Sequence, residues 1–557
     1  MGGYNIANNV SQYPNQHPDQ HAIVFDPNNT DRVITGHDGG LSVTNDIRAV
    51  PATWTDVNNG YNVTQFYTVA LQDSENSNLI VGGTQDNGSP FFTFDLSGQS
   101  ISPSEDLSSG DGAYAYLGDS FGYVSSQLGR VMRLKYLSDG TLTSPRTAPV
   151  GEWSVIKPIG SEGHLFITPF VVDPSNEEIM YYLAGSALWR NNQLSAIANF
   201  QDSTSTGWSE LTDLTPGNLL TTLEVSTTNP SHRLYYAAFS GSSAPLVYRL
   251  DNADTATDGE VNISIPGAAS GSYIHDIEIN PNNADELIVL MSNYNILGLY
   301  HSVDAGANWT AIEGNLQNDG VNPGPSLRNA EIITFNGKTH YLVGASTGLF
   351  QTTSLNGNST QWEPAATDKI GNVPVEFIAS RSDGLIAAAT HGRGIFTGQP
   401  GREITVGDNG GNQGWRMLSA PVKQFSASKL KGAPVQGLVR GPDEGDDANM
   451  FVFDKQATPQ FRAPQFDESI DEGHGFIMFF FDNTINNAEL LPNLLQTPGE
   501  EPVQDVQIAL NDQNFTLVGN PFSANLHTTD GITIDAGVQS TIHIWDDQTG
   551  SYNNSAF

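Results

Sequence analysis

Residues 301–310 read HSVDAGANWT and contain Ser302, Asp304, Gly306 and Trp309 in the pattern S-x-D-x-G-x-x-W. Gly306 permits the positive φ of a tight turn, and the Ser302 and Asp304 side chains can bond backbone amides within that turn. Trp309 is large enough to fill the space between two packed sheets. The segment therefore predicts a turn between two strands, followed by an aromatic anchor.

Tryptophans recur at a regular spacing along the first 400 residues. Trp54, Trp153, Trp208, Trp309 and Trp362 are separated by intervals of about 50 or about 100 residues. Since the longer intervals are twice the shorter ones, the repeat is about 51 residues long, and some units lack the tryptophan. A period near 50 residues is typical of β-propellers.

Each repeat contains the same succession of strands and turns. The turns DPNNTD, DPSNEE, NPSHR and NPNNAD begin at Asp26, Asp173, Asn229 and Asn280. Pro fixes φ and Asn tolerates the left-handed region, so these turns predict tight connections between strands. The second strands follow and are rich in β-branched and aromatic residues. They read RVITG, NLIVGG, IMYYLAG, RLYYAAF, ELIVLM and HYLVGA.

The number of first strands predicts seven or eight blades, with eight as the literal count. The last unit ends at 387–398, AAATHGRGIFTG, without a fourth strand. Residues 1–12 are predicted to supply that strand, because closing the ring removes exposed strand edges. The predicted first strands begin near His21, Phe66, Gly112, Leu165, Leu219, Tyr273, Ala330 and Val375.

The repeat ends at Pro400. Residues 401–414, GREITVGDNGGNQG, predict a linker between a propeller at 1–400 and a second domain at 415–557. The second domain contains short apolar or alternating strands such as GFIMFFF from Gly475, which predicts a β-sandwich. We expect this sandwich to be incomplete at its C-terminus. The predicted fold class is therefore all-β, a seven- or eight-bladed β-propeller followed by a β-sandwich.

Composition excludes several functions. The chain has 23 Lys+Arg against 61 Asp+Glu, a formal net charge of -38, so binding to nucleic acid or anionic lipid is not expected. No apolar run approaches the ~20 residues of a membrane helix, so membrane insertion is not expected either. The absence of cysteine excludes disulfides, thiolate zinc sites and cysteine nucleophiles. An acidic surface can still bind Ca²⁺ or another divalent ion loosely.

The pattern at 301–310 matches the Asp-box, the bacterial neuraminidase repeat, and degenerate copies occur at 42–54 and 354–362. The likeness to secreted sortilin-like or xyloglucanase-like propeller proteins of the Bacteroidota is dense from residue 17 to about residue 135 and looser over the rest of the propeller. The stretches that resemble this group are HPDQHAIVFDPNN, GHDGGL, NNGYNVTQFYTVA, VGGTQDNGSP and ATHGRGIF.

The second domain also resembles a known group. GWRMLSAPV, GNPFSANL and IWDDQTGSY are similar to the sandwich that precedes the sorting domain in type IX secretion cargo. The resemblance implies an extracellular or outer cell-surface location and export by the type IX machinery through a C-terminal domain missing from this chain. It also implies that this chain is a fragment of a longer protein, which would explain why residues 1–20 contain no signal peptide.

The sharpest local cluster is HPDQH. His17, Asp19 and His21 alternate along a predicted strand, so their side chains can share one face. Two imidazoles and a carboxylate suit zinc or a similar divalent ion. The alternative is a hydrogen-bonded cluster at the mouth of the ring, and no fourth ligand can be placed from the sequence.

Histidines also recur at one phase of the repeat. His21 and His275 lie five residues before Asp26 and Asn280, so we expect both to gather at one opening. Carboxylates, amides and imidazoles around that opening would suit sugar hydroxyl groups, with Trp or Tyr as stacking platforms. Turn formation is the alternative role for most of these residues. The predicted ligand-binding residues are His17, His21, Asp38, Gln85, Asp86, Asn87, Asp111 and His275.

Three enzymatic interpretations differ in the residues they need. A sialidase needs an arginine clamp, but the arginines of the first 250 residues are scattered. A polysaccharide lyase would use His21 or His275, without a supporting motif. A xyloglucanase-like glycoside hydrolase of β-glucans needs two carboxylates across a cleft, and Asp19 and Asp276 are the candidates for one of them.

The preferred interpretation is a propeller module that binds a polysaccharide or a surface protein. The resemblance implies that the hydrolase cleft would lie between two propellers, of which this chain has one. The hydrolase and a purely structural adhesion module remain the alternatives, so the sequence leaves open whether the protein is an enzyme.

Overall fold

The chain is described by a computed structural model from residue 14 to residue 480, with gaps, and at 493–497, 541–546 and 551–556. It divides into two compact units, Met1–Ile333 with Thr339–Thr397 and Thr334–Lys338 with Gly398–Phe557. No helix in the described part is long and apolar enough to span a membrane. The gaps are 18, 62, 75–76, 94–103, 138–139, 144–152, 200–201, 215–216, 229, 318–323, 336, 368, 401, 407–413, 431–434, 443–446, 455–456 and 472.

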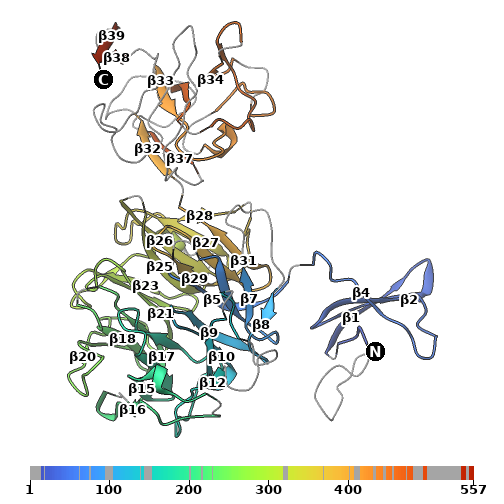
Figure 1. Ribbon diagram of the computed structural model, residues 1–557, viewed down its shortest axis with the longest axis vertical. Coiled ribbons are helices and arrows are strands. Elements are labelled where there is room, and N and C mark those ends of the chain that lie inside the picture. Colours follow the sequence, from blue (N-terminus) through green and yellow to red (C-terminus); the bar gives the residue numbers. More distant parts are fainter. Residues whose placement is uncertain are drawn as a thin grey trace. The chain divides into compact units, whose positions relative to one another are not determined.

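Seven antiparallel sheets follow one another from β5 to β31 in the described part of the first unit, coloured from blue to orange in Figure 1. We number them blades 1 to 7; the first six have four strands and the seventh has three. In chain order they comprise β5 (Phe66–Leu71), β6 (Leu79–Thr84), β7 (Pro90–Thr93) and β8 (Glu105–Asp106); β9 (Gly112–Leu117), β10 (Phe121–Ser126), β11 (Arg130–Lys135) and β12 (Trp153–Val155); β13 (Phe170–Val172), β14 (Met180–Ala184), β15 (Ala187–Asn191) and β16 (Trp208–Glu210); β17 (Leu219–Val225), β18 (Leu234–Phe239), β19 (Leu246–Leu250) and β20 (Val261–Asn262); β21 (Ile274–Ile279), β22 (Leu287–Met291), β23 (Leu299–Ser302) and β24 (Thr310–Ala311); β25 (Leu327–Phe335), β26 (Lys338–Ala345), β27 (Gly348–Thr352) and β28 (Glu363–Ala365); and β29 (Val375–Ser380), β30 (Ile386–Thr390) and β31 (Gly394–Gly398).

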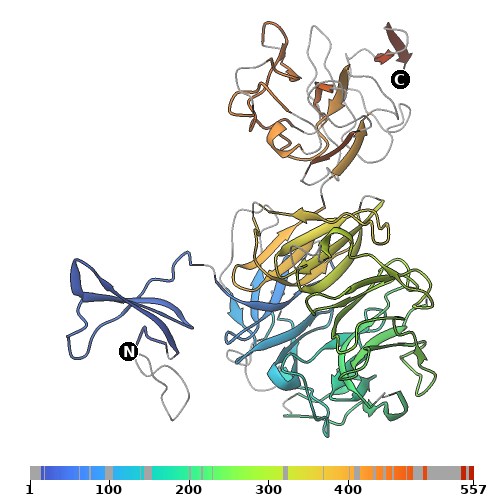
Figure 2. The same ribbon diagram turned by 180° about the vertical axis from the view of Figure 1, so that it is seen from behind.

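The ring closes between blade 7 and blade 1. Phe66 and Val69 of β5 share a buried cluster with Ala387 and Ala389 of β30, and Figures 1 and 2 both show the blue start of the ring next to its orange end. Closure removes the exposed faces that an open row of sheets would leave. The first unit is therefore a β-propeller, which confirms the predicted all-β fold class.

An eighth blade-like sheet precedes the ring. It contains β1 (Gln20–Asp26), β2 (Asn29–His37), β3 (Gly40–Thr44) and β4 (Thr55–Asp56) in chain order. None of the hydrophobic clusters found among the described residues includes a residue of this sheet. The ring thus closes without it, so seven of the eight predicted blades form the ring. The predicted closing strand at 1–12 lies outside the described residues.

Three of the periodic tryptophans connect neighbouring blades. Their indole N–H groups donate to a carbonyl just after the fourth strand of the preceding blade, at 2.8 Å from Trp208 to Ile156, from Trp309 to Ile263 and from Trp362 to Ile312. For these three residues the sequence period is the period of one repeated contact.

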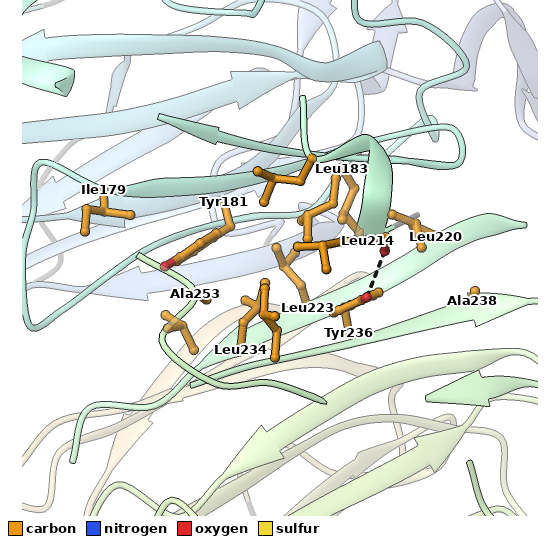
Figure 3. Packing of buried hydrophobic residues seen from close by; sticks show 14 residues of the cluster. Ile179, Tyr181, Leu183, Leu214, Leu220, Leu223, Leu234, Tyr236, Ala238 and Ala253 are labelled. Carbon is orange, nitrogen blue, oxygen red and sulfur yellow. Dashed lines mark hydrogen bonds between the residues drawn. The ribbon is translucent and has the colours of Figure 1, made fainter. Parts of the chain in front are cut away.

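Between the blades lie apolar cores. Leu183 of blade 3 belongs to the same buried cluster as Leu220, Leu223 and Tyr236 of blade 4 (Figure 3). The Tyr236 hydroxyl donates to the Leu214 carbonyl at 2.8 Å, which satisfies its only polar group inside this core. Large aromatic and branched side chains on both faces of a blade thus join it to its neighbours.

The second unit is also all-β where it is described. Its four-stranded sheet has the order β33-β36-β34-β35, and Phe476 and Met478 of β36 are buried in its core. The GFIMFFF segment is thus the inner strand that its apolar run predicts. Part of the predicted linker forms β32, which pairs with β37. The strands are β32 (Arg402–Val406), β33 (Gly414–Ser419), β34 (Met450–Phe453), β35 (Phe461–Arg462), β36 (Gly475–Phe480), β37 (Asn493–Thr497), β38 (Thr541–Asp546) and β39 (Ser551–Ala556).

We predict that Trp362→Phe destabilises the propeller more than Trp189→Phe does. Both changes shorten a buried aromatic side chain, but only Trp362 loses a hydrogen bond, since the indole N–H of Trp189 has no partner among the described residues. The free energy of unfolding should fall by about 1 kcal/mol more for Trp362→Phe. Urea denaturation followed by circular dichroism measures this difference, and equal losses would show that the indole bond adds no stability.

Candidate functional site

The first strands of neighbouring blades are joined by side chains that bind backbone amides. The Asp276 carboxylate of β21 accepts hydrogen bonds from the Ala330 backbone N–H and from Asn329 Nδ2 of β25, both at 2.8 Å. Glu278 of β21 accepts one from the Ile332 N–H at 3.0 Å. Each first strand lies at the edge of its sheet, so one of its edges has no strand partner. The carboxylates bind amides at these edges.

The same arrangement continues into blade 7. Asn329 Oδ1 accepts a hydrogen bond from the Ile378 backbone N–H of β29 at 2.8 Å. Glu331 of β25 accepts hydrogen bonds from the side chain and backbone of Ser380. A belt of side chains therefore connects the first strands of blades 5, 6 and 7.

Burial in this belt raises the pKa of its carboxyl groups. Desolvation raises the pKa of Glu224 and of Glu331 to about 8 and that of Asp276 to about 7. The pKa of Glu278 is also well above its ordinary value, first because of burial and then because of the Glu331 charge. We call Glu224, Asp276, Glu278 and Glu331 the acidic belt. Part of the acidic belt is consequently protonated near neutral pH.

His275 lies beside Asp276 on β21, and its ring centroid is 6.3 Å from that of Tyr273. Burial, followed by the charge of Arg328, lowers the pKa of His275 to about 4, so its imidazole is neutral. His21 lies on β1, in the N-terminal sheet, which is not part of the closed ring. The structure therefore places His275 and Asp276 in the ring, and His21 and Asp19 with the N-terminal sheet.

The N-terminal residues form a compact polar group. Ligand atoms of His17, Asp19 and Asp38 all lie within 4.8 Å of one another, and His21 Nε2 is bonded to Asp38 Oδ1. The predicted alternation along one strand is not what unites them. β1 begins only at Gln20, and Asp19 has a left-handed φ of 51°. The β2–β3 turn brings Asp38 to the group instead.

The predicted turn residues of blade 1 meet at Asp111, which precedes β9. The buried Asp111 Oδ1 accepts hydrogen bonds from the Asp86 backbone N–H at 3.2 Å and from the Tyr67 hydroxyl at 3.4 Å. Burial, and then the charge of Asp111, raises the pKa of Asp86. The same two causes raise the pKa of Tyr67 to about 12. Asn87 Nδ2 donates to the Gln85 carbonyl at 3.0 Å. These residues order the β6–β7 turn.

The S-x-D-x-G-x-x-W segment forms the β23–β24 turn. Ser302 Oγ accepts a hydrogen bond from the Gly306 backbone N–H at 2.9 Å, and Asp304 Oδ1 accepts one from the Asn308 N–H at 2.8 Å. Gly306 has a φ of 84°, and an added Cβ would lie 2.5 Å from Ile263. Together with the Trp309 indole bond, this geometry gives all four residues structural contacts.

The structure also exposes a feature that the sequence did not reveal. Leu128, in the β10–β11 turn, has a left-handed φ of 59° and a relative exposure of 54%. Its backbone N–H donates to the carbonyl of Phe166, which is 52% exposed, at 2.9 Å. Lys157 Nζ donates to the Leu128 carbonyl at 3.3 Å. We call Leu128 and Phe166 the apolar pair.

The sequence did not predict the apolar pair for two reasons. The predicted first strand near Leu165 placed Phe166 inside blade 3, whereas β13 begins at Phe170. Leu128 is followed by Gly129, with a φ of 74°, and such a pair indicates a turn without revealing which residue is exposed.

Comparisons with known proteins show no family. No family model matches the chain, and no curated protein matches it. Among solved structures, YCF48 from Cyanidioschyzon merolae is similar with a TM-score of 0.41 and 9% identity, over 60% of this chain and 96% of that one. KlHsv2 with loop 6CD replaced by a Gly-Ser linker is similar with a TM-score of 0.32 and 10% identity, over 62% and 96% of the two chains.

We predict that Glu224→Gln weakens the pH dependence of stability. Glu224 has an ordinary pKa of 4.5 and a folded pKa of about 8. Its contribution to the free energy of unfolding is therefore complete below pH 4.5 and is lost as pH rises through 8. The glutamine cannot ionise, so the variant should exceed the wild type in unfolding free energy at pH 9 by roughly 1–3 kcal/mol. Urea denaturation between pH 5 and 9 measures the effect.

Glu286→Gln is the matched control, because hydrogen bonding to His301 lowers the pKa of Glu286. A group whose pKa is lowered in the folded state stabilises the fold at pH values above its ordinary pKa. This stabilisation is lost as pH falls through the folded pKa. This variant should therefore be destabilised at pH 7. A Glu224→Gln curve parallel to the wild-type curve across this range would contradict burial of Glu224 as the cause.

Proposed function

We propose that this protein is a binding module that recognises a neutral glycan at the end of the ring that carries the apolar pair. The observation that supports the proposal is that Phe166 and Leu128 are both exposed and are joined by a backbone hydrogen bond, with Leu128 in a left-handed turn. An exposed aromatic ring offers a flat apolar surface against which a sugar ring can stack. A leucine held at positive φ stores backbone strain, which is typical of functional sites.

Polar groups belong to the same end of the propeller. In a four-stranded antiparallel blade, the turn between the second and third strands and the connection to the next blade emerge at one end. Leu128 and Asp86 lie in such turns, while Phe166 and Asp111 lie in such connections. This end therefore combines apolar side chains with carboxylate and amide groups that can bond sugar hydroxyls.

Charge favours a neutral ligand. With a formal net charge of -38, the protein repels acidic polymers, including acidic polysaccharides. The remaining predictions from the resemblance, an extracellular or cell-surface location and export by a type IX route, fit a module that binds a polysaccharide outside the cell. A surface protein as ligand and a purely structural adhesion role are the competing possibilities.

A xyloglucanase-like hydrolase remains the enzymatic alternative. Its two candidate carboxylates differ in setting, because Asp276 binds the Asn329 and Ala330 amide groups within the ring while Asp19 belongs to the N-terminal group. An inverting or retaining hydrolase needs its two carboxyl groups across one bound sugar. Reducing-sugar release from β-glucans that Asp276→Asn abolishes would favour this alternative over simple binding.

We predict that Phe166→Ala lowers affinity for a neutral glycan about tenfold, a loss of about 1.4 kcal/mol. Glycan-array screening identifies the ligand, and isothermal titration calorimetry then measures affinity. Val303→Ala is the matched control, because Val303 is 63% exposed but lies in the β23–β24 turn, at the opposite end of its blade. An array without any bound glycan, or equal affinities for both variants, would contradict the proposal.

A further inference from the structure

The N-terminal polar group combines the ligand types of a transition-metal site. One imidazole and two carboxylates, from His17, Asp19 and Asp38, have their ligand atoms within 4.8 Å of one another. They come from two separate segments, the residues before β1 and the β2–β3 turn. Folding of the sheet therefore assembles the group. Nitrogen and oxygen donors together suit zinc and neighbouring first-row ions better than Ca²⁺, which prefers oxygen ligands alone.

A buried nitrogen atom beside this group provides an independent observation. His37 is only 9% exposed, and its ring stacks on that of His17 with centroids 6.0 Å apart. His37 Nε2 is bonded to Ser42 Oγ at 2.8 Å, whereas its Nδ1 is buried without a hydrogen-bond partner in the described part of the chain. A buried polar atom without a partner costs stability, so its retention next to three potential ligands points to a ligand that satisfies it.

A neighbouring histidine orients one of the carboxylates. His21 Nε2 is hydrogen-bonded to Asp38 Oδ1, and such a partner orients a carboxylate ligand.

We propose that His17, Asp19 and Asp38 bind a divalent transition-metal ion such as Zn²⁺, and that His37 Nδ1, which is not among the atoms within 4.8 Å of one another, turns towards the ion as the fourth ligand. Ligand atoms about 2.1 Å from zinc lie about 3.4 Å apart in a tetrahedron. The three atoms lie within 4.8 Å of one another, so side-chain rotation can bring them to this spacing. The ion would connect the start of β1 to the β2–β3 turn, and this site does not depend on glycan binding at the ring.

The test uses the full chain and Zn²⁺ alone. After equilibration with zinc and dialysis, elemental analysis by mass spectrometry should find one zinc ion per chain. His17→Gln and Asp38→Asn should each reduce this to none, with unchanged circular dichroism. His232→Gln is the matched control, since His232 also pairs with an aspartate, Asp173, at 2.7 Å. It should retain one zinc ion per chain.

A measurement on the unmodified protein protects the test against a variant that fails to fold. Zn²⁺ should protect His17 from modification by diethyl pyrocarbonate, as followed by mass spectrometry, and should leave His232 unprotected. A wild-type protein that retains no zinc, zinc retained in full by His17→Gln, or equal labelling of His17 with and without zinc would each overturn the proposal.

Discussion

The first strand of each blade has one edge without a strand partner, and its N–H groups cannot be left unbonded where water is scarce. In blades 6 and 7, side chains of the preceding blade bind some of these N–H groups. Asp276 and Glu278 bind amides of β25, and Asn329 binds an amide of β29. Hydrogen bonds to a carboxylate are stronger than those between neutral groups. The ring thus depends on polar side chains that repeat at the same position of successive blades.

These contacts explain why carboxyl groups persist in a buried setting. Burial raises the pKa of Asp276 to about 7 and that of Glu331 to about 8. The cost of burial is limited because a protonated carboxyl group carries no charge and its carbonyl oxygen still accepts the amide hydrogen bond. Away from the first strands, the Trp362 indole bond connects blades 5 and 6, and the Trp309 indole bond connects blades 4 and 5. Blades 5 and 6 are therefore joined both at their first strands and near the fourth strand of blade 5.

Much of the fold follows from the sequence, because the strongest signals are local. The tryptophan period reflects one repeated contact, and the turn at Asp173 forms because its side chain binds the Ser175 N–H at 2.9 Å. Which sheets join the ring does not follow from local signals. β1 to β4 have the strand pattern of a blade, yet ring closure is decided by whether Phe66 packs on Ala387, and no local pattern encodes that contact.

The candidate sites show the same division. HPDQH predicted a polar group, but Asp38 joins it through the β2–β3 turn, and the partnerless Nδ1 of His37 is visible only after folding. The apolar pair could not be predicted, because its exposure depends on where β13 begins. Likewise, Glu278 and Glu331 alternate with apolar residues as surface residues of a strand would, although Glu278 binds the Ile332 amide and Glu331 binds Ser380 of the next blade.

Side chains of one blade cap backbone amides of the next, and amide hydrogen exchange at Ala330, Ile332 and Ile378 measures this capping residue by residue. These amides should exchange as slowly as neighbouring amides bonded within the sheets, and Asp276→Ala should accelerate exchange at Ala330 before Ile378. Fast exchange at all three positions in the wild-type protein would contradict this capping.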